Sequence, residues 1–164
     1  VTIVLMTGCI DADEAFSYVD GWLLALIFAM LGVGSALQSS GAVGVIADTL
    51  SPVMLVLPPF FVVLSVYLLS SILTELVSNN AVAVVMTPIA IGLAGALGVD
   101  PRPLVVAVMI AASCAFATPI GYQTNTMVYA PGGYKFSDFL RLGLPMNLGM
   151  GLLGSFLIPI FWPF

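Results

Sequence analysis

The sequence predicts an all-α integral membrane protein. Of its 164 residues, 61% are hydrophobic and only 7% are charged, and the mean hydropathy is +1.19. A soluble domain carries about 25% charged residues, so this chain lacks the side chains that a water-facing surface requires. Its long apolar runs are separated by short polar or proline-rich stretches, the pattern of successive membrane helices.

The composition excludes two classes of function. Only three Lys and Arg residues stand against eight Asp and Glu, so no basic patch is available to bind nucleic acid. The chain has no His, the commonest general base, and Glu75 has no obvious catalytic partner, so we do not expect an enzyme. Cys9 and Cys114 lie in apolar runs as small hydrophobic residues, and we infer neither a disulfide nor a compartment from them.

Residues 1–57 are expected to form scaffold and linker helices. Residues 1–10 are interpreted as the last turns of a membrane helix, followed by an acidic loop over 11–20. Residues 22–37 would rise about 24 Å as a helix, nearly a full span. Residues 42–57 contain an aspartate and a Ser-Pro pair, which favour a helix along the membrane interface. Because the chain begins within an apolar run, we expect it to be the C-terminal part of a longer protein.

Residues 58–98 are predicted to form a helical hairpin around a polar tip. Two apolar arms, 60–77 and 81–97, meet at Thr-Glu-Leu-Val-Ser-Asn-Asn, residues 74–80. The arm lengths allow either two full spans or a re-entrant hairpin whose tip reaches the membrane midplane. The polar tip favours the re-entrant hairpin, because non-helical backbone at membrane depth is tolerated where it lines a protein cavity.

Residues 99–134 are predicted to form a discontinuous transmembrane helix. An apolar half-helix over 104–117 stops at a second polar segment, 118–126, and a short second half follows at 126–129. Polar segments that interrupt apolar runs are the best sequence indication of a transporter's binding site. We therefore expect the hairpin tip and this second segment to face each other.

Residues 135–164 are predicted to contain the last transmembrane helix. The apolar run over 142–164 ends in Phe-Trp-Pro-Phe, which is typical of an interfacial anchor. Lys135 and Arg141 precede this run, and Arg102 lies on the opposite side of the membrane if the discontinuous helix crosses once. The positive-inside rule then places Lys135 in the cytoplasm.

The two polar segments carry groups that suit an anion together with a cation. A break between half-helices leaves carbonyl groups on one side and N–H groups on the other without helical partners. Carbonyl ends, expected near Gly121, suit a hard cation such as Na⁺, and N–H ends suit an anion. Hydroxyl and amide side chains can serve either ion, and those of the two segments include Ser78, Asn79, Asn80, Thr124 and Asn125.

No basic residue lies in either polar segment. A buried anion would therefore be unpaired, at a prohibitive cost in free energy, unless a cation were bound beside it. This favours cation-coupled anion transport. Glu75 is the one charged residue in these segments, and its context leaves three roles open: a proton site, a cation ligand, or a structural acceptor for backbone N–H groups.

Motifs along most of the chain resemble the divalent anion:sodium symporter (DASS) family of citrate-transporter-like permeases. Thr-Glu-Leu-Val-Ser-Asn-Asn-Ala at 74–81 is similar to that family's second Ser-Asn-Thr hairpin tip, and Ala-Thr-Pro-Ile-Gly-Tyr-Gln-Thr-Asn at 117–125 is similar to its unwound helix. Residues 129–138 and 143–148 look like its closing segment. The resemblance implies the second inverted repeat of an elevator-type transporter, usually a homodimer, which works in a lipid membrane with an N-terminal repeat.

The resemblance also implies roles for particular residues. Thr74, Val77 and Asn79 line a Na⁺ site, partly through backbone carbonyls. Ser78 and Asn79 belong to the Ser-Asn-Thr motif, of which Asn79 also contacts the substrate. The resemblance implies that Thr124 and Asn125 close the site from the unwound helix.

Two departures from the family pattern bear on the substrate. Asn80 stands where dicarboxylate carriers have Thr, and Gln123-Thr124 stands where many have a Pro pair. The pattern is more similar to the sulfate-permease-like branch with inserted cytoplasmic regulatory domains. This implies Na⁺-coupled sulfate transport in a bacterial inner or plasma membrane. A Na⁺- or H⁺-coupled di- or tricarboxylate symporter is the alternative, followed by an anion channel or an ion-efflux protein.

Overall fold

The structure, a computed structural model, describes Thr7, Asp11 and residues 21–164. All regular structure within this part is helical, as predicted. The predicted helix end at 1–10, most of the acidic loop at 11–20, and Cys9 lie outside the described residues.

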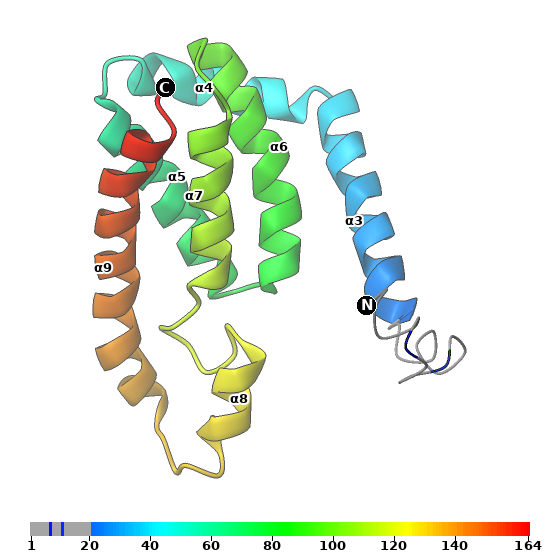
Figure 1. The fold of residues 1–164 in the computed structure, drawn as a ribbon, viewed down its shortest axis with the longest axis vertical. Coiled ribbons are helices and arrows are strands. Elements are labelled where there is room, and N and C mark those ends of the chain that lie inside the picture. Colours follow the sequence, from blue (N-terminus) through cyan, green and yellow to red (C-terminus); the bar gives the residue numbers. More distant parts are fainter. Residues whose placement is uncertain (1–6, 8–10, 12–20) are drawn as a thin grey trace.

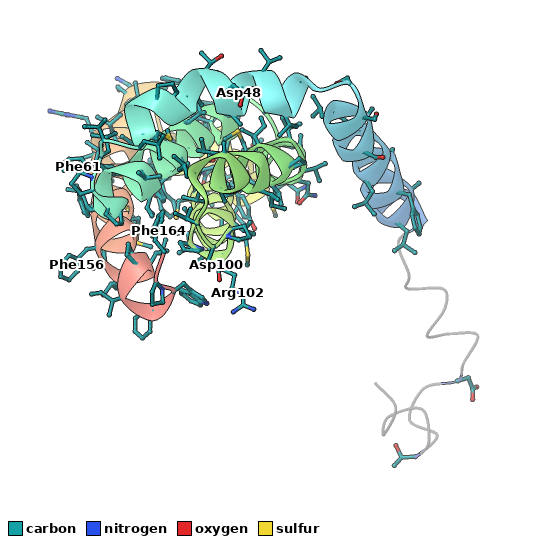
Figure 2. All side chains as sticks on the ribbon, turned by 90° about the horizontal axis from the view of Figure 1, so that it is seen from above. Asp48, Phe61, Asp100, Arg102, Phe156 and Phe164 are labelled. Carbon is teal, nitrogen blue, oxygen red and sulfur yellow. The ribbon has the colours of Figure 1, made fainter. Side chains whose placement is uncertain are left out.

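Helices α3 (Gly21–Ser39) and α4 (Ala42–Met54) form the outer part of the described chain. Helix α3 lies at the outer edge and contacts α6, where a Cβ on Gly34 would lie 3.5 Å from Pro88. Helix α4 crosses one end of the helix bundle, which Figure 2 shows from above. It ends three residues earlier than the predicted helix at 42–57 and contains Pro52.

The predicted hairpin consists of α5 (Pro59–Thr74) and α6 (Asn79–Leu97), joined by residues 75–78 (Figure 1). The first arm ends three residues before the predicted position 77. The second arm begins two residues before the predicted position 81, because the Ser78 hydroxyl accepts a hydrogen bond from Ala81 N–H at 3.4 Å. Four residues of non-helical tip therefore separate the two arms.

The predicted break in the next helix lies between α7 (Arg102–Ser113) and α8 (Gln123–Tyr129). Residues 114–122 have no helical structure and form the segment that we call the unwound segment. The prediction of a half-helix extending to residue 117 and resuming at 126 was wrong at both ends. Backbone groups in this segment bond to the side chains of Glu75 and Asn125 instead of continuing the helix.

The last helix, α9 (Phe136–Phe161), has 26 residues and begins six residues before the predicted apolar run. The carboxylate of Asp138 accepts a hydrogen bond from Lys135 N–H at 2.8 Å, which caps the helix. Helices α6 and α9 are long and apolar enough to cross a membrane. Outward-pointing side chains such as Phe61 and Phe156 are largely exposed in this chain (Figure 2).

Helices α5, α7 and α9 pack closely because small residues lie at their contacts. Ala107 and Ala111 of α7 are fully buried, and Cys114 is buried, as predicted for a small hydrophobic residue. On α9, a Cβ on Gly151 would lie 2.7 Å from the Tyr67 ring, and one on Gly143 would overlap the Phe116 carbonyl. Glycine at these two positions is what allows α9 to approach its neighbours.

We expect Gly143→Ala to lower the unfolding free energy by about 1–3 kcal/mol, because the new methyl group overlaps backbone that must then move. Gly149→Ala on the same helix is the matched control. Nothing lies within 4 Å of a Cβ at that position, and alanine is the better helix former by up to about 1 kcal/mol. Thermal unfolding of the purified protein in detergent measures both variants. Equal midpoints for the two variants would contradict the close approach at Gly143.

Candidate functional site

A cavity of about 240 Å³ lies between the hairpin tip and the unwound segment. The residues that line it come from both segments: Ser78, Asn79 and Asn80 from the hairpin, and Ile120, Gly121, Tyr122 and Gln123 from the other side. The prediction that the two polar segments face each other is therefore confirmed.

The lining of this cavity is uncharged and combines polar groups with the apolar side chain of Ile120. No Lys, Arg, Asp or Glu of the described part is among its lining residues. Helix α6 begins at Asn79, so the N–H groups of Asn79 and Asn80 have no carbonyl partner within the helix. Amide side chains and the positive end of a helix dipole are suitable groups for binding a small anion.

A cluster of oxygen atoms lies beside the cavity, around Thr74. Thr74 is fully buried, and its hydroxyl lies 2.8 Å from Asn79 Oδ1 and 3.2 Å from the Ala112 carbonyl oxygen. Hydroxyl, amide and backbone carbonyl oxygens are the ligands that hard cations prefer. Val77 is half exposed at the tip, and its only oxygen is that of its backbone. Asn79 belongs both to this cluster and to the cavity lining.

The Glu75 carboxylate is buried behind the cavity. Its Oε1 accepts hydrogen bonds from Ala117 N–H at 2.8 Å and from Asn147 Nδ2 at 2.7 Å. Its backbone carbonyl accepts a hydrogen bond from the Thr118 hydroxyl at 3.2 Å. A Cβ on Gly121 would lie 2.9 Å from Glu75 Oε2, so glycine allows the cavity wall to pack directly on the carboxylate.

Asn147, which donates to the Glu75 carboxylate, was assigned no role from the sequence. It lies on α9, is only 8% exposed, and lies 72 positions from Glu75 in the chain. The only amide side chain of a largely apolar helix was the available signal, because a buried polar group in a membrane helix needs a partner. Its partner cannot be identified from sequence spacing.

The structure does not bring Thr124 and Asn125 into the cavity. Both lie in the first turn of α8 rather than in the unwound segment, and Thr124 is exposed. Asn125 Nδ2 donates hydrogen bonds to the carbonyls of Ala115 at 2.9 Å and Thr118 at 3.1 Å, so its side chain holds the bend of the unwound segment. Asn125 also lines a second cavity of about 280 Å³ between α8 and α9.

Discontinuous membrane helices typically form the substrate and ion sites of secondary transporters. The family described as "Citrate transporter" (CitMHS) matches residues 1–111. The chain belongs to this family of integral membrane transporters, which confirms the resemblance found in the sequence.

Three relatives illustrate the similarity. Over 99% of this chain, the sequence is 36% identical to an uncharacterised transporter of Synechocystis. Over 95% of this chain, it is 32% identical to sodium/sulfate cotransporter 2 of Chlamydomonas reinhardtii. It is 36% identical to mouse solute carrier family 13 member 2 over 82% of its length. These matches cover 26%, 18% and 24% of the relatives, so the chain spans about a quarter of their length or less.

We expect Thr74→Val to lower the unfolding free energy by about 1–2 kcal/mol, because it leaves the part-buried Asn79 Oδ1 without its donor. Thr74→Ser is the matched control, since it keeps the hydroxyl and removes only a methyl group. Chemical unfolding in detergent compares the two variants. A Thr74→Ser protein less stable than Thr74→Val would show that the methyl packing, and not the hydrogen bond, matters at this position.

Proposed function

We propose that this chain is part of a secondary transporter that carries a small divalent anion together with Na⁺. Sulfate is the first candidate substrate. The observation that carries the proposal is the uncharged cavity between the hairpin tip and residues 120–123, with the oxygen cluster around Thr74 beside it. Relatives named sodium/sulfate cotransporters support both ions.

The coupling follows from electrostatics. The three basic residues, Arg102, Lys135 and Arg141, lie exposed at the ends of helices and do not line the cavity. An anion bound there loses its hydration and gains no fixed positive charge in return, which is costly. A Na⁺ ion in the neighbouring oxygen cluster compensates this charge, so each ion favours the binding of the other.

The proposed roles follow the placement of the groups for Thr74, Ser78, Asn79 and Asn80, and those of Val77 and Gly121 follow from the sequence analysis. The substrate contacts are Ser78, Asn79 and Asn80, which line the cavity. The Na⁺ ligands are Thr74 and Asn79 through their side chains and Val77 and Gly121 through their carbonyls. Asn125 supports the unwound segment, and we leave Thr124 out of the site because its side chain is exposed on α8.

The short first arm and the position of the tip support a re-entrant hairpin over residues 58–98, whereas the second arm, α6, is itself long enough to span. Helix α5 has 16 residues and rises about 24 Å, whereas α9 has 26 and rises about 39 Å. Figure 1 shows the hairpin tip ending partway along α9, with α8 beyond it. A polar tip that stops within the membrane is acceptable because it faces the unwound segment rather than lipid.

The rest of the chain is assigned to the other parts of the proposed transporter. Residues 1–57 belong to the scaffold and linker, 99–134 to the discontinuous helix, and 135–164 to the last span. An N-terminal inverted repeat completes the binding site, and the transporter works by an elevator movement as a homodimer in a bacterial inner membrane.

Citrate or a related di- or tricarboxylate is the second candidate substrate. The family description, "Citrate transporter", favours it. Citrate has more acceptor oxygens than sulfate, and the amides of Asn79, Asn80 and Gln123 line the cavity as donors. Competition by citrate and succinate against labelled sulfate separates the two candidates.

We expect the complete transporter in proteoliposomes to accumulate radiolabelled sulfate when an inward Na⁺ gradient is present. Asn79→Ala should lower this uptake at least tenfold, because Asn79 contributes to both the cavity and the oxygen cluster. Ser65→Ala is the matched control on the same hairpin, since the Ser65 hydroxyl donates to the Phe61 carbonyl of its own helix and does not line the cavity.

Uptake that is indifferent to Na⁺, or that does not saturate, would contradict a Na⁺-coupled carrier and favour a channel. Strong inhibition by citrate with little sulfate accumulation would replace sulfate by a carboxylate as substrate. An Asn79→Ala protein that transports like Ser65→Ala would remove the hairpin tip from the site.

A further inference from the structure

The two sides of the proposed Na⁺ site belong to different segments of the chain. Thr74 and Asn79 lie on the hairpin, and Gly121 lies on the unwound segment. An ion held by both sides requires a fixed distance between them, because its affinity depends on how well the ligand oxygens are placed in advance. The contacts that connect the two segments therefore decide the affinity for the ion.

Glu75 makes several of these contacts. It follows Thr74 directly, and its Oε1 accepts the Ala117 N–H hydrogen bond at 2.8 Å while its carbonyl accepts the Thr118 hydroxyl at 3.2 Å. Its Oε2 packs against Gly121. The orientation of the Glu75 carboxylate thus determines where the unwound segment lies relative to Thr74.

Asn147 fixes that orientation from a third element. Its Nδ2 donates to Glu75 Oε1 at 2.7 Å, and its backbone carbonyl accepts the Tyr67 hydroxyl of α5 at 3.2 Å. Glu75 Oε2 and Asn147 Oδ1 have no hydrogen-bond partner within the described part of the chain. Within the described residues the carboxylate therefore accepts hydrogen bonds only at Oε1, and Asn147 provides one of the two donors.

We propose that Asn147 is a positioning residue for the Na⁺ site and acts on it through Glu75. It touches neither ion. Its donor holds the Glu75 carboxylate against Ala117, and this sets the separation of Thr74 from Gly121. The inference rests on the proposed Na⁺-coupled function and deepens it by adding a residue of α9 to the determinants of cation affinity.

The test compares two Asn147 variants of the complete transporter. Asn147→Leu keeps nearly the same shape and has no donor, whereas Asn147→Gln keeps the amide donor on a longer stem. We expect Asn147→Leu to raise the Na⁺ concentration for half-maximal uptake about tenfold, the low end of the range for residues that orient a metal ligand. The anion concentration for half-maximal uptake at saturating Na⁺ should change less than twofold. Asn147→Gln should lie within about threefold of the wild type for Na⁺.

Ser155→Ala is the control for a polar substitution on the buried face of α9. Its hydroxyl is fully buried and has no partner within the described residues, so its loss should leave both half-saturating concentrations unchanged. Uptake is measured at equal amounts of protein in the vesicles. A variant that folds less well then shows a lower maximal rate at unchanged half-saturating concentrations.

Each outcome of these uptake measurements either supports or overturns the role of Asn147. A wild type whose uptake depends on Na⁺, with an Asn147→Leu variant of unchanged Na⁺ dependence, overturns this inference alone. Equal shifts for Na⁺ and the anion, or equal shifts for the Leu and Gln variants, also overturn it. A wild type that ignores Na⁺ overturns the proposed function together with the inference.

Discussion

The buried carboxylate of Glu75 is the group on which the arrangement of this chain depends. A carboxylate at this depth loses its hydration and must recover hydrogen bonds from the protein. Each donor that it finds is on a different element: Ala117 on the unwound segment and Asn147 on α9. The hydrogen bonds of one buried carboxylate therefore join the hairpin, the broken helix and the last helix.

The need of buried polar groups for hydrogen-bond partners also explains why the chain can be non-helical at the unwound segment. A break in a membrane helix leaves backbone groups without partners, and lipid provides none. In this chain Glu75 accepts from the Ala117 N–H, and Asn125 donates to the Ala115 and Thr118 carbonyls. The two polar segments thus stabilise each other, and neither is expected to hold its conformation alone.

The sequence was sufficient to predict the class of protein, the hairpin and the break between α7 and α8. Lipid accepts apolar helices but not unpaired backbone groups, so polar residues within apolar runs indicate where the helices end. It was not sufficient for the helix ends. Helix α7 ends at Ser113, before the polar residues begin, because the groups that replace its hydrogen bonds come from Glu75 and Asn125. For the same reason Thr124 was expected at the cavity but lies on α8. Asn147 could be recognised as polar but not paired, since its partner lies on another helix.

The glycines of α9 also determine which side of the last helix faces its neighbours. Gly143, Asn147 and Gly151 recur every four residues and lie on one side of the helix, where each is buried. A rotation by one residue would turn this face by about 100° and present Leu144 and Leu152 to contacts that admit no Cβ. Other rotations of α9 about its axis are therefore excluded by shape. The one rotation that fits also brings the Asn147 amide to Glu75, so shape and hydrogen bonding select the same position of the helix.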